Sequence, residues 1–219
     1  MNPKLRFIVG FGLFFVALWL LWNTPVVYPL KIFVVLLHEV SHALAVVATG
    51  GTLDRITLDP YQGGATYFTG GSAFLALSAG YLGSLAWGGF MFTAAQKPWV
   101  RTDWVNSGIG VLVILLTIFF VRSGFGIVFG LCFGVAMVTA SQKIGPVMNR
   151  RLLLGLGLTS ALYAILDIKS DILDRPGLRS DAHMLAELTG IGTTIWGILW
   201  IGVAVAFSTW LLLKAYDRA

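Results

Sequence analysis

The chain has 219 residues, of which 57% are hydrophobic and only 11% are charged, whereas soluble domains carry about 25% charged residues. This composition excludes a water-soluble fold, and the length allows one membrane domain of several crossings, because a helix needs about 20 apolar residues to cross a bilayer. The formal net charge of +5 does not indicate nucleic-acid binding, because the lysines and arginines are scattered between the apolar runs.

Seven apolar runs follow one another along the chain. They are continuously apolar rather than alternating, which predicts transmembrane helices and not the strands of a β-barrel. The first run follows a basic segment but lacks the cleavage site of a signal peptide, so we interpret it as a retained helix. The predicted fold is an all-α polytopic membrane protein in which residues 1–219 form a single domain with six or seven transmembrane helices. The runs lie at about residues 7–22, 26–49, 72–95, 104–121, 124–141, 152–168 and 186–213.

The second run contains a cluster of ionisable residues, His38-Glu39-Val40-Ser41-His42, although the whole chain has only three histidines and two glutamates. Residues four apart share one face of a helix, so His38 and His42 can present imidazole nitrogens to one zinc ion. Glu39 is then placed to take a proton from a water bound to that ion. Ionisable groups inside a membrane span are costly unless they are paired or bind a metal. The pattern therefore favours a zinc site over a polar cluster that only joins helices.

The connection that follows this run, residues 50–68, differs from the others. Glycine pairs at 50–51 and 63–64 flank short stretches rich in threonine, isoleucine, tyrosine and phenylalanine. This pattern is typical of strands joined by turns. We expect a small membrane-associated β-hairpin or sheet near residues 52–68.

A catalytic zinc ion usually has three protein ligands, so the two histidines need a partner from elsewhere in the chain. Asp167 ends the sixth apolar run and is the acid that we expect at membrane depth. Asp171 lies one turn further along the same face, and a solvated helix end explains it equally well. Asp181 is as well placed to cap the last helical pattern as to bind a metal. The candidates are Asp167, Asp171, Asp174, Asp181, His183 and Glu187.

Four segments resemble the motifs of one known family. The stretch at residues 37–43 matches its H-E-x-x-H motif, and the glycine-rich segment around residues 63–64 looks like its membrane-associated sheet. Residues 79–82 lie where relatives carry an A-G-P-like stretch, and Leu166-Asp167 is similar to an L-D-G motif. This combination resembles the site-2 proteases, which are intramembrane zinc metalloproteases that cut transmembrane segments of regulatory proteins, and in particular their small bacterial and plant branch.

The resemblance implies roles for individual residues. Zinc is the expected cofactor, and Glu39 is the expected catalytic base. The small branch favours further aspartates in the region after the sixth run, so the third ligand has more than one candidate. The implied metal ligands are His38, His42 and Asp167, with Asp171 and Asp181 as alternatives to Asp167.

The predicted function is that of a zinc-dependent endopeptidase that hydrolyses peptide bonds within or near transmembrane segments of membrane-protein substrates. We expect it to work in the lipid bilayer, as a multi-pass protein of the plasma membrane of a bacterium. An unwound substrate segment would add as a strand to the edge of the predicted sheet. The alternative is a non-catalytic metal-binding membrane protein or assembly factor that retains the H-E-x-x-H motif. The sequence favours no oligomeric state.

Overall fold

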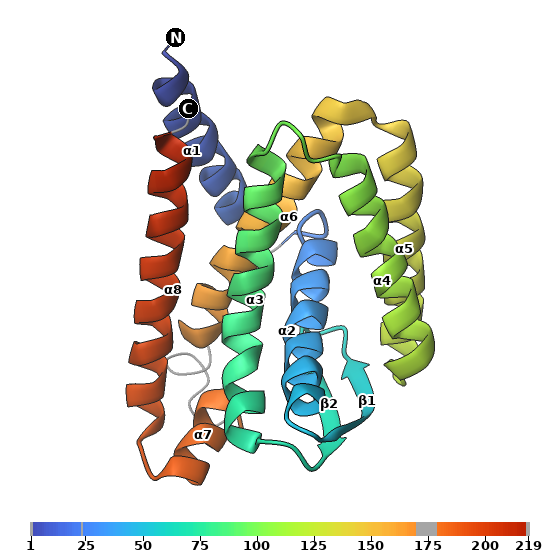
Figure 1. Cartoon of the computed structure of the whole chain (residues 1–219), viewed down its shortest axis with the longest axis vertical. Coiled ribbons are helices and arrows are strands. Elements are labelled where there is room, and N and C mark those ends of the chain that lie inside the picture. The colour runs from blue at the N-terminus through green and yellow to red at the C-terminus, as the bar shows by residue number, and fades with distance from the viewer. Residues whose placement is uncertain (1, 23, 170–178, 218–219) are drawn as a thin grey trace.

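The computed structural model describes residues 2–22, 24–169 and 179–217, and within them it contains eight helices and one two-stranded sheet (Figure 1). Seven of these helices, all except α7, are long and apolar enough to cross a membrane. The predicted class, an all-α multi-pass membrane protein with a small β-hairpin, is therefore confirmed. The elements in chain order are α1 (Pro3–Leu21), α2 (Tyr28–Ala48), β1 (Thr52–Leu58), β2 (Gly64–Thr69), α3 (Ala73–Gln96), α4 (Thr102–Phe120), α5 (Gly124–Lys143), α6 (Gly145–Lys169), α7 (Asp181–Thr189) and α8 (Thr193–Tyr216).

Helix α6 begins at Gly145, well before the predicted start of the sixth run at residue 152. Gly145 has φ 71°, and this left-handed conformation lets the chain reverse directly from α5 into α6. The guanidinium of Arg150 then donates to the carbonyl oxygen of Ala95 at the end of α3, over 2.8 Å. Arg150 thus has a partner at the end of α3. The residues from Gly145 to position 152 are part of α6 and not of a loop.

The seventh apolar run, placed at about residues 186–213, corresponds to a membrane-length helix, but this helix begins later, at Thr193. The chain breaks at Gly190, which has φ 72° and whose N–H donates to the carbonyl oxygen of Ala186. A glycine in the left-handed region ends a helix without the steric cost of a Cβ atom. The break separates a short helix, α7, from the membrane-length helix α8. As a result, α7 is an independent element whose first residue is Asp181.

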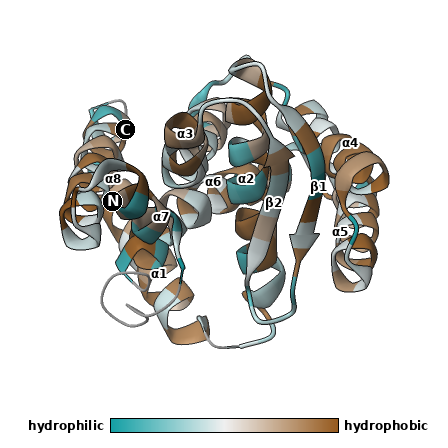
Figure 2. Ribbon diagram, turned by 90° about the horizontal axis from the view of Figure 1, so that it is seen from below, coloured by the Kyte–Doolittle hydropathy of each residue, from teal (hydrophilic) through white to brown (hydrophobic). Residues whose placement is uncertain are grey.

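Helix α2 lies in the middle of the molecule and packs against α3, α6 and the hairpin (Figure 1). In its most apolar stretch 72% of the residues are buried, against 6% in α1. Viewed from below, α2 has hydrophilic patches and lies between α3, α6 and the hairpin (Figure 2). Polar side chains on α2 therefore need partners from the protein, because the surrounding apolar medium supplies none.

The predicted hairpin near residues 52–68 is confirmed: β1 and β2 pair antiparallel. The Asp59 carboxylate accepts the backbone N–H groups of Tyr61 and Gly63 and closes the turn between them. On its other side, β1 meets the connection between α4 and α5, where the N–H of Arg122 donates to the carbonyl oxygen of Ile56. In the described part of the chain no strand pairs with the outer edge of β2.

Glycines bring α3 and α6 into close backbone contact. A Cβ atom on Gly157 would lie 2.6 Å from the backbone nitrogen of Phe92, and one on Gly88 would lie 2.7 Å from the backbone nitrogen of Ala161. Small residues of this kind let membrane helices approach closely enough for their backbones to pack. Since α3 and α6 both border α2, this contact fixes two walls around the centre of the molecule.

The close contact between α3 and α6 predicts that alanine substitutions at two glycines of α6 change the stability of the protein to different extents. Gly157→Ala forces a methyl group into the backbone of α3, and such overpacking costs about 1–3 kcal/mol. Gly155→Ala is the matched control, because the nearest atom to its Cβ, on Phe14, is 3.8 Å away. We expect the thermal unfolding midpoint in detergent to fall for Gly157→Ala and to stay level or rise for Gly155→Ala. Equal midpoints would contradict the close packing of α3 on α6.

Candidate metal centre

His38 and His42 project from one face of α2, one helical turn apart, with ring centroids separated by 4.7 Å. The Nδ1 atom of His42 lies 2.7 Å from the carbonyl oxygen of Ala76 on α3. Because a carbonyl oxygen only accepts, Nδ1 carries the proton and donates. When a metal ion displaces the proton from Nε2 of His42, that nitrogen offers its lone pair as a ligand, and a hydrogen bond at the other ring nitrogen is typical of metal-binding histidines.

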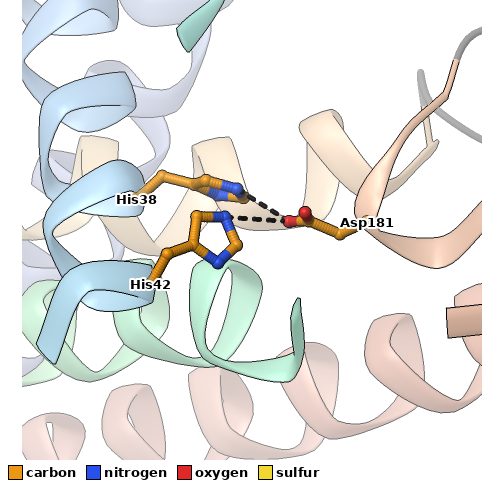
Figure 3. Close-up of side chains that lie close together, drawn as sticks. All are labelled: His38, His42 and Asp181. Atoms are coloured by element: carbon orange, nitrogen blue, oxygen red, sulfur yellow. Dashed lines mark hydrogen bonds and ion pairs between the residues drawn. The ribbon is translucent and has the colours of Figure 1, made fainter. Parts of the chain in front are cut away.

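Asp181 meets both histidines from the first turn of α7 (Figure 3). One of its carboxylate oxygens, Oδ2, lies 2.9 Å from Nε2 of His38 and 3.2 Å from Nε2 of His42. Ser180 caps α7, its hydroxyl accepting the backbone N–H of His183, and so helps to place Asp181. Burial alone would raise the pKa of the Asp181 carboxyl, but the charge and hydrogen bonds of the two imidazoles hold this pKa well below its usual range. The ionised form is the one that binds a cation.

The ligand atoms of His38, His42 and Asp181 all lie within 4.8 Å of one another. Two atoms that are each about 2.0–2.2 Å from a zinc ion lie at most about 4.4 Å apart. The distances of 2.9 and 3.2 Å from Asp181 to the two histidines are inside this limit, and the bound of 4.8 Å exceeds it by an amount that a small side-chain rotation removes. The donor set, two imidazole nitrogens and one carboxylate oxygen, is one that zinc sites use. These three residues therefore fit a single bound metal ion.

Asp167 approaches the other side of His38. Its Oδ2 atom lies 3.8 Å from Nδ1 of His38, whereas Asp181 faces Nε2. The structure thus brings Asp167 together with one histidine and Asp181 with both. A carboxylate at the second ring nitrogen orients an imidazole and raises its basicity. Two further candidates of the sequence analysis, Asp171 and Asp174, lie outside the described residues.

His183 and Glu187 lie further along α7, away from the two α2 histidines. Their side chains are 3.7 Å apart, and Glu187 also pairs with Arg179 over 3.2 Å. All three side chains are substantially exposed. Among the described residues, no cluster of three or more potential metal ligands includes His183 or Glu187.

Glu39 is buried between α2 and the hairpin, with 5% of its surface exposed. The hydroxyl of Thr66 on β2 lies 2.7 Å from Oε2 of Glu39 and 2.9 Å from its backbone oxygen. Glu39 directly follows His38 on α2, and its carboxyl contacts Thr66, a residue that the sequence analysis did not identify. No local pattern around Thr66 indicates this contact.

Gly80 on α3 is a second residue that the sequence analysis gave no role, although it lies in the stretch at 79–82. A Cβ atom at this position would lie 2.4 Å from Nε2 of His38 and 2.5 Å from Cε1 of His42. Only glycine leaves both imidazoles in place. In the sequence, the need for a small residue here is indicated by the glycine itself. The spacing of the H-E-x-x-H motif does not predict it.

An open cleft of about 970 Å³ leads to these residues. Its lining includes β2 together with the preceding turn, residues 62–68, and Tyr163 and Asp167 of α6. Arg179 and Glu187 lie at its border with α7. His38, Glu39 and His42 all line this cleft, together with both polar and apolar side chains.

Comparison with known proteins identifies one family. The sequence matches the model of one protein family, Peptidase M50B-like, over residues 12–211. The match covers most of the chain, including all three residues of the metal cluster. No curated protein and no solved structure matches the chain significantly. The chain belongs to the Peptidase M50B-like family, which is the site-2 protease family of peptidases.

Proposed function

We propose that the protein is an intramembrane zinc metalloprotease that hydrolyses peptide bonds within or near transmembrane segments of membrane-protein substrates. The observation that carries the proposal is the convergence of His38, His42 and Asp181 beside Glu39. These residues border an open cleft within a bundle of apolar helices. Family membership supports peptidase activity at the level of the family.

We assign the zinc ligands to His38, His42 and Asp181. When bound, zinc polarises the carbonyl under attack and lowers the pKa of the attacking water. The resemblance to the family implies Asp167 as the third ligand, but the distances favour Asp181. Among the carboxylates of the described residues, only that of Asp181 lies within 3.2 Å of both imidazoles. Asp167, at the other nitrogen of His38, then orients that ring.

Glu39 acts as general base and then as general acid. Its carboxylate takes a proton from the attacking water and returns it to the amine of the leaving peptide, so that protons balance over the cycle. A carboxylate in this role must be held within hydrogen-bonding reach of the reacting atoms. The contact with the Thr66 hydroxyl supports such a fixed position.

The substrate segment must lose its helical hydrogen bonds before attack, because a transmembrane helix bonds its own carbonyls. The edge of β2 lines the cleft at residues 64–68, and no strand in the described part of the chain pairs with it. An extended segment can therefore add to this edge through main-chain hydrogen bonds. We propose that strand addition presents the scissile bond to Glu39.

The rival function is that of a non-catalytic metal-binding membrane protein or assembly factor that retains the motif. Glu39→Gln separates the two, because an amide cannot serve as a general base. We expect the variant to fold and to bind zinc while cleavage of a membrane substrate falls by about 10²–10⁴-fold. Glu187→Gln, the same change at the only other glutamate, should cleave normally. Undiminished cleavage by Glu39→Gln would sink the proteolytic mechanism.

Metal analysis of the purified protein tests the assignment of the third ligand. Asp181→Ala should lose stoichiometric zinc, because it removes an atom close to both histidines. Asp167→Ala should retain zinc with an affinity lowered by about 10–100-fold, the usual effect of removing a group that orients a metal-binding histidine. Chelator competition measures both. Loss of zinc in Asp167→Ala with full retention in Asp181→Ala would reverse the assignment.

A further inference from the structure

The carboxyl of Glu39 is held on two sides by strand β2. The Thr66 hydroxyl is 2.7 Å from Oε2 of Glu39. On the other side, a Cβ atom on Gly64 would lie 2.5 Å from Oε1 and 2.7 Å from Cγ of Glu39. Gly64 and Thr66 are two apart on one strand, so they present the same face of the sheet to α2.

We propose that Thr66 is a positioning residue for Glu39, and that Gly64 provides the space in which the carboxyl is held. This inference rests on the proposed function, because it assigns a role to Thr66 in the reaction of Glu39. Thr66 itself does not act on the substrate. Its effect is to fix one orientation of a side chain that has three rotatable bonds and is otherwise free to turn within the cleft.

A hydroxyl is well suited to this role. The Thr66 oxygen lies within hydrogen-bonding distance of both the carboxylate and the backbone oxygen of Glu39, and its single proton can be donated to either. A hydroxyl can also accept a hydrogen bond. Thr66 can therefore remain bonded to the Glu39 side chain both before and after that side chain takes up the proton of the attacking water.

The position of Thr66 also links the base to the substrate. Residues 64–68 line the cleft, and the free edge of the same strand is the one proposed to receive the unwound segment. One short strand, anchored by its pairing with β1, then holds both the substrate backbone and the carboxyl of Glu39. The distance between scissile bond and base is fixed within one element and does not depend on how two helices move relative to each other.

The test compares Thr66→Val, which removes the hydroxyl at nearly constant volume, with Thr66→Ser, which keeps it. Thr57→Val is the matched control, because Thr57 lies on β1 of the same hairpin and its hydroxyl is directed at the carbonyl oxygen of Ala65. The protein is labelled with ¹³C at the glutamate carboxyls. The chain has only Glu39 and Glu187, so the spectrum contains two carboxyl signals, and Glu39→Gln identifies them.

We expect Thr66→Val to shift the Glu39 signal and leave the Glu187 signal in place, whereas Thr66→Ser and Thr57→Val leave both unchanged. In cleavage assays Thr66→Val should lower kcat about 10–100-fold, as for the loss of a hydrogen bond to a charged group. KM should stay within about twofold, because substrate binding does not involve this hydroxyl. Zinc content should remain at one ion per chain, and Thr66→Ser should restore kcat.

An unchanged Glu39 signal together with an unchanged kcat in Thr66→Val would overturn the proposal. If Thr66→Val does not fold, Gly64→Ala provides the second test, since its methyl group displaces the same carboxyl and must also shift the Glu39 signal. If the wild-type protein binds zinc but cleaves no membrane substrate, the proposed function fails. The labelled spectra then still decide whether Thr66 holds Glu39, so the two failures are distinguishable.

Discussion

The side chains of Glu39 and His42 are buried, and that of His38 is only 13% exposed, on the most enclosed helix of an apolar bundle. Ionisable groups that are largely removed from water are costly, so each needs a partner from the protein or a bound cation. The partners come from different elements: a carbonyl of α3 for His42, a carboxylate of α7 for both histidines, and a hydroxyl of β2 for Glu39. The elements that pack around α2 therefore also supply the groups that hold the side chains of the site.

Two glycines leave the space that the side chains of the site occupy. Gly80 on α3 lies against the two imidazoles, and Gly64 on β2 lies against the Glu39 carboxyl. At both positions a single methyl group would occupy the volume of a functional atom. Glycines at the α3–α6 crossing let these two helices pack closely. Glycines at the site leave room for its side chains, so close helix packing and an open cleft occur in the same molecule.

Much of this arrangement could be predicted from the sequence, because its causes are local. Continuous apolar runs indicate membrane helices, glycine pairs indicate the hairpin, and the spacing of His38 and His42 places both on one helical face. The third partner could not be predicted in the same way. Asp181 is 143 residues from His38, so the sequence analysis could give it only as an alternative to Asp167. Thr66 is a long-range contact for which the sequence has no local signal.

In the proposed site, two imidazoles of α2 and one carboxylate bind a zinc ion inside the membrane domain. X-ray absorption spectroscopy at the zinc edge of the purified protein tests it most directly, because the spectrum counts the imidazoles and reports the type of the other donors. Two imidazole nitrogens at about 2.0–2.1 Å together with oxygen donors and no sulfur are predicted. A spectrum with fewer than two imidazoles, or with a sulfur atom at about 2.3 Å, would contradict the site.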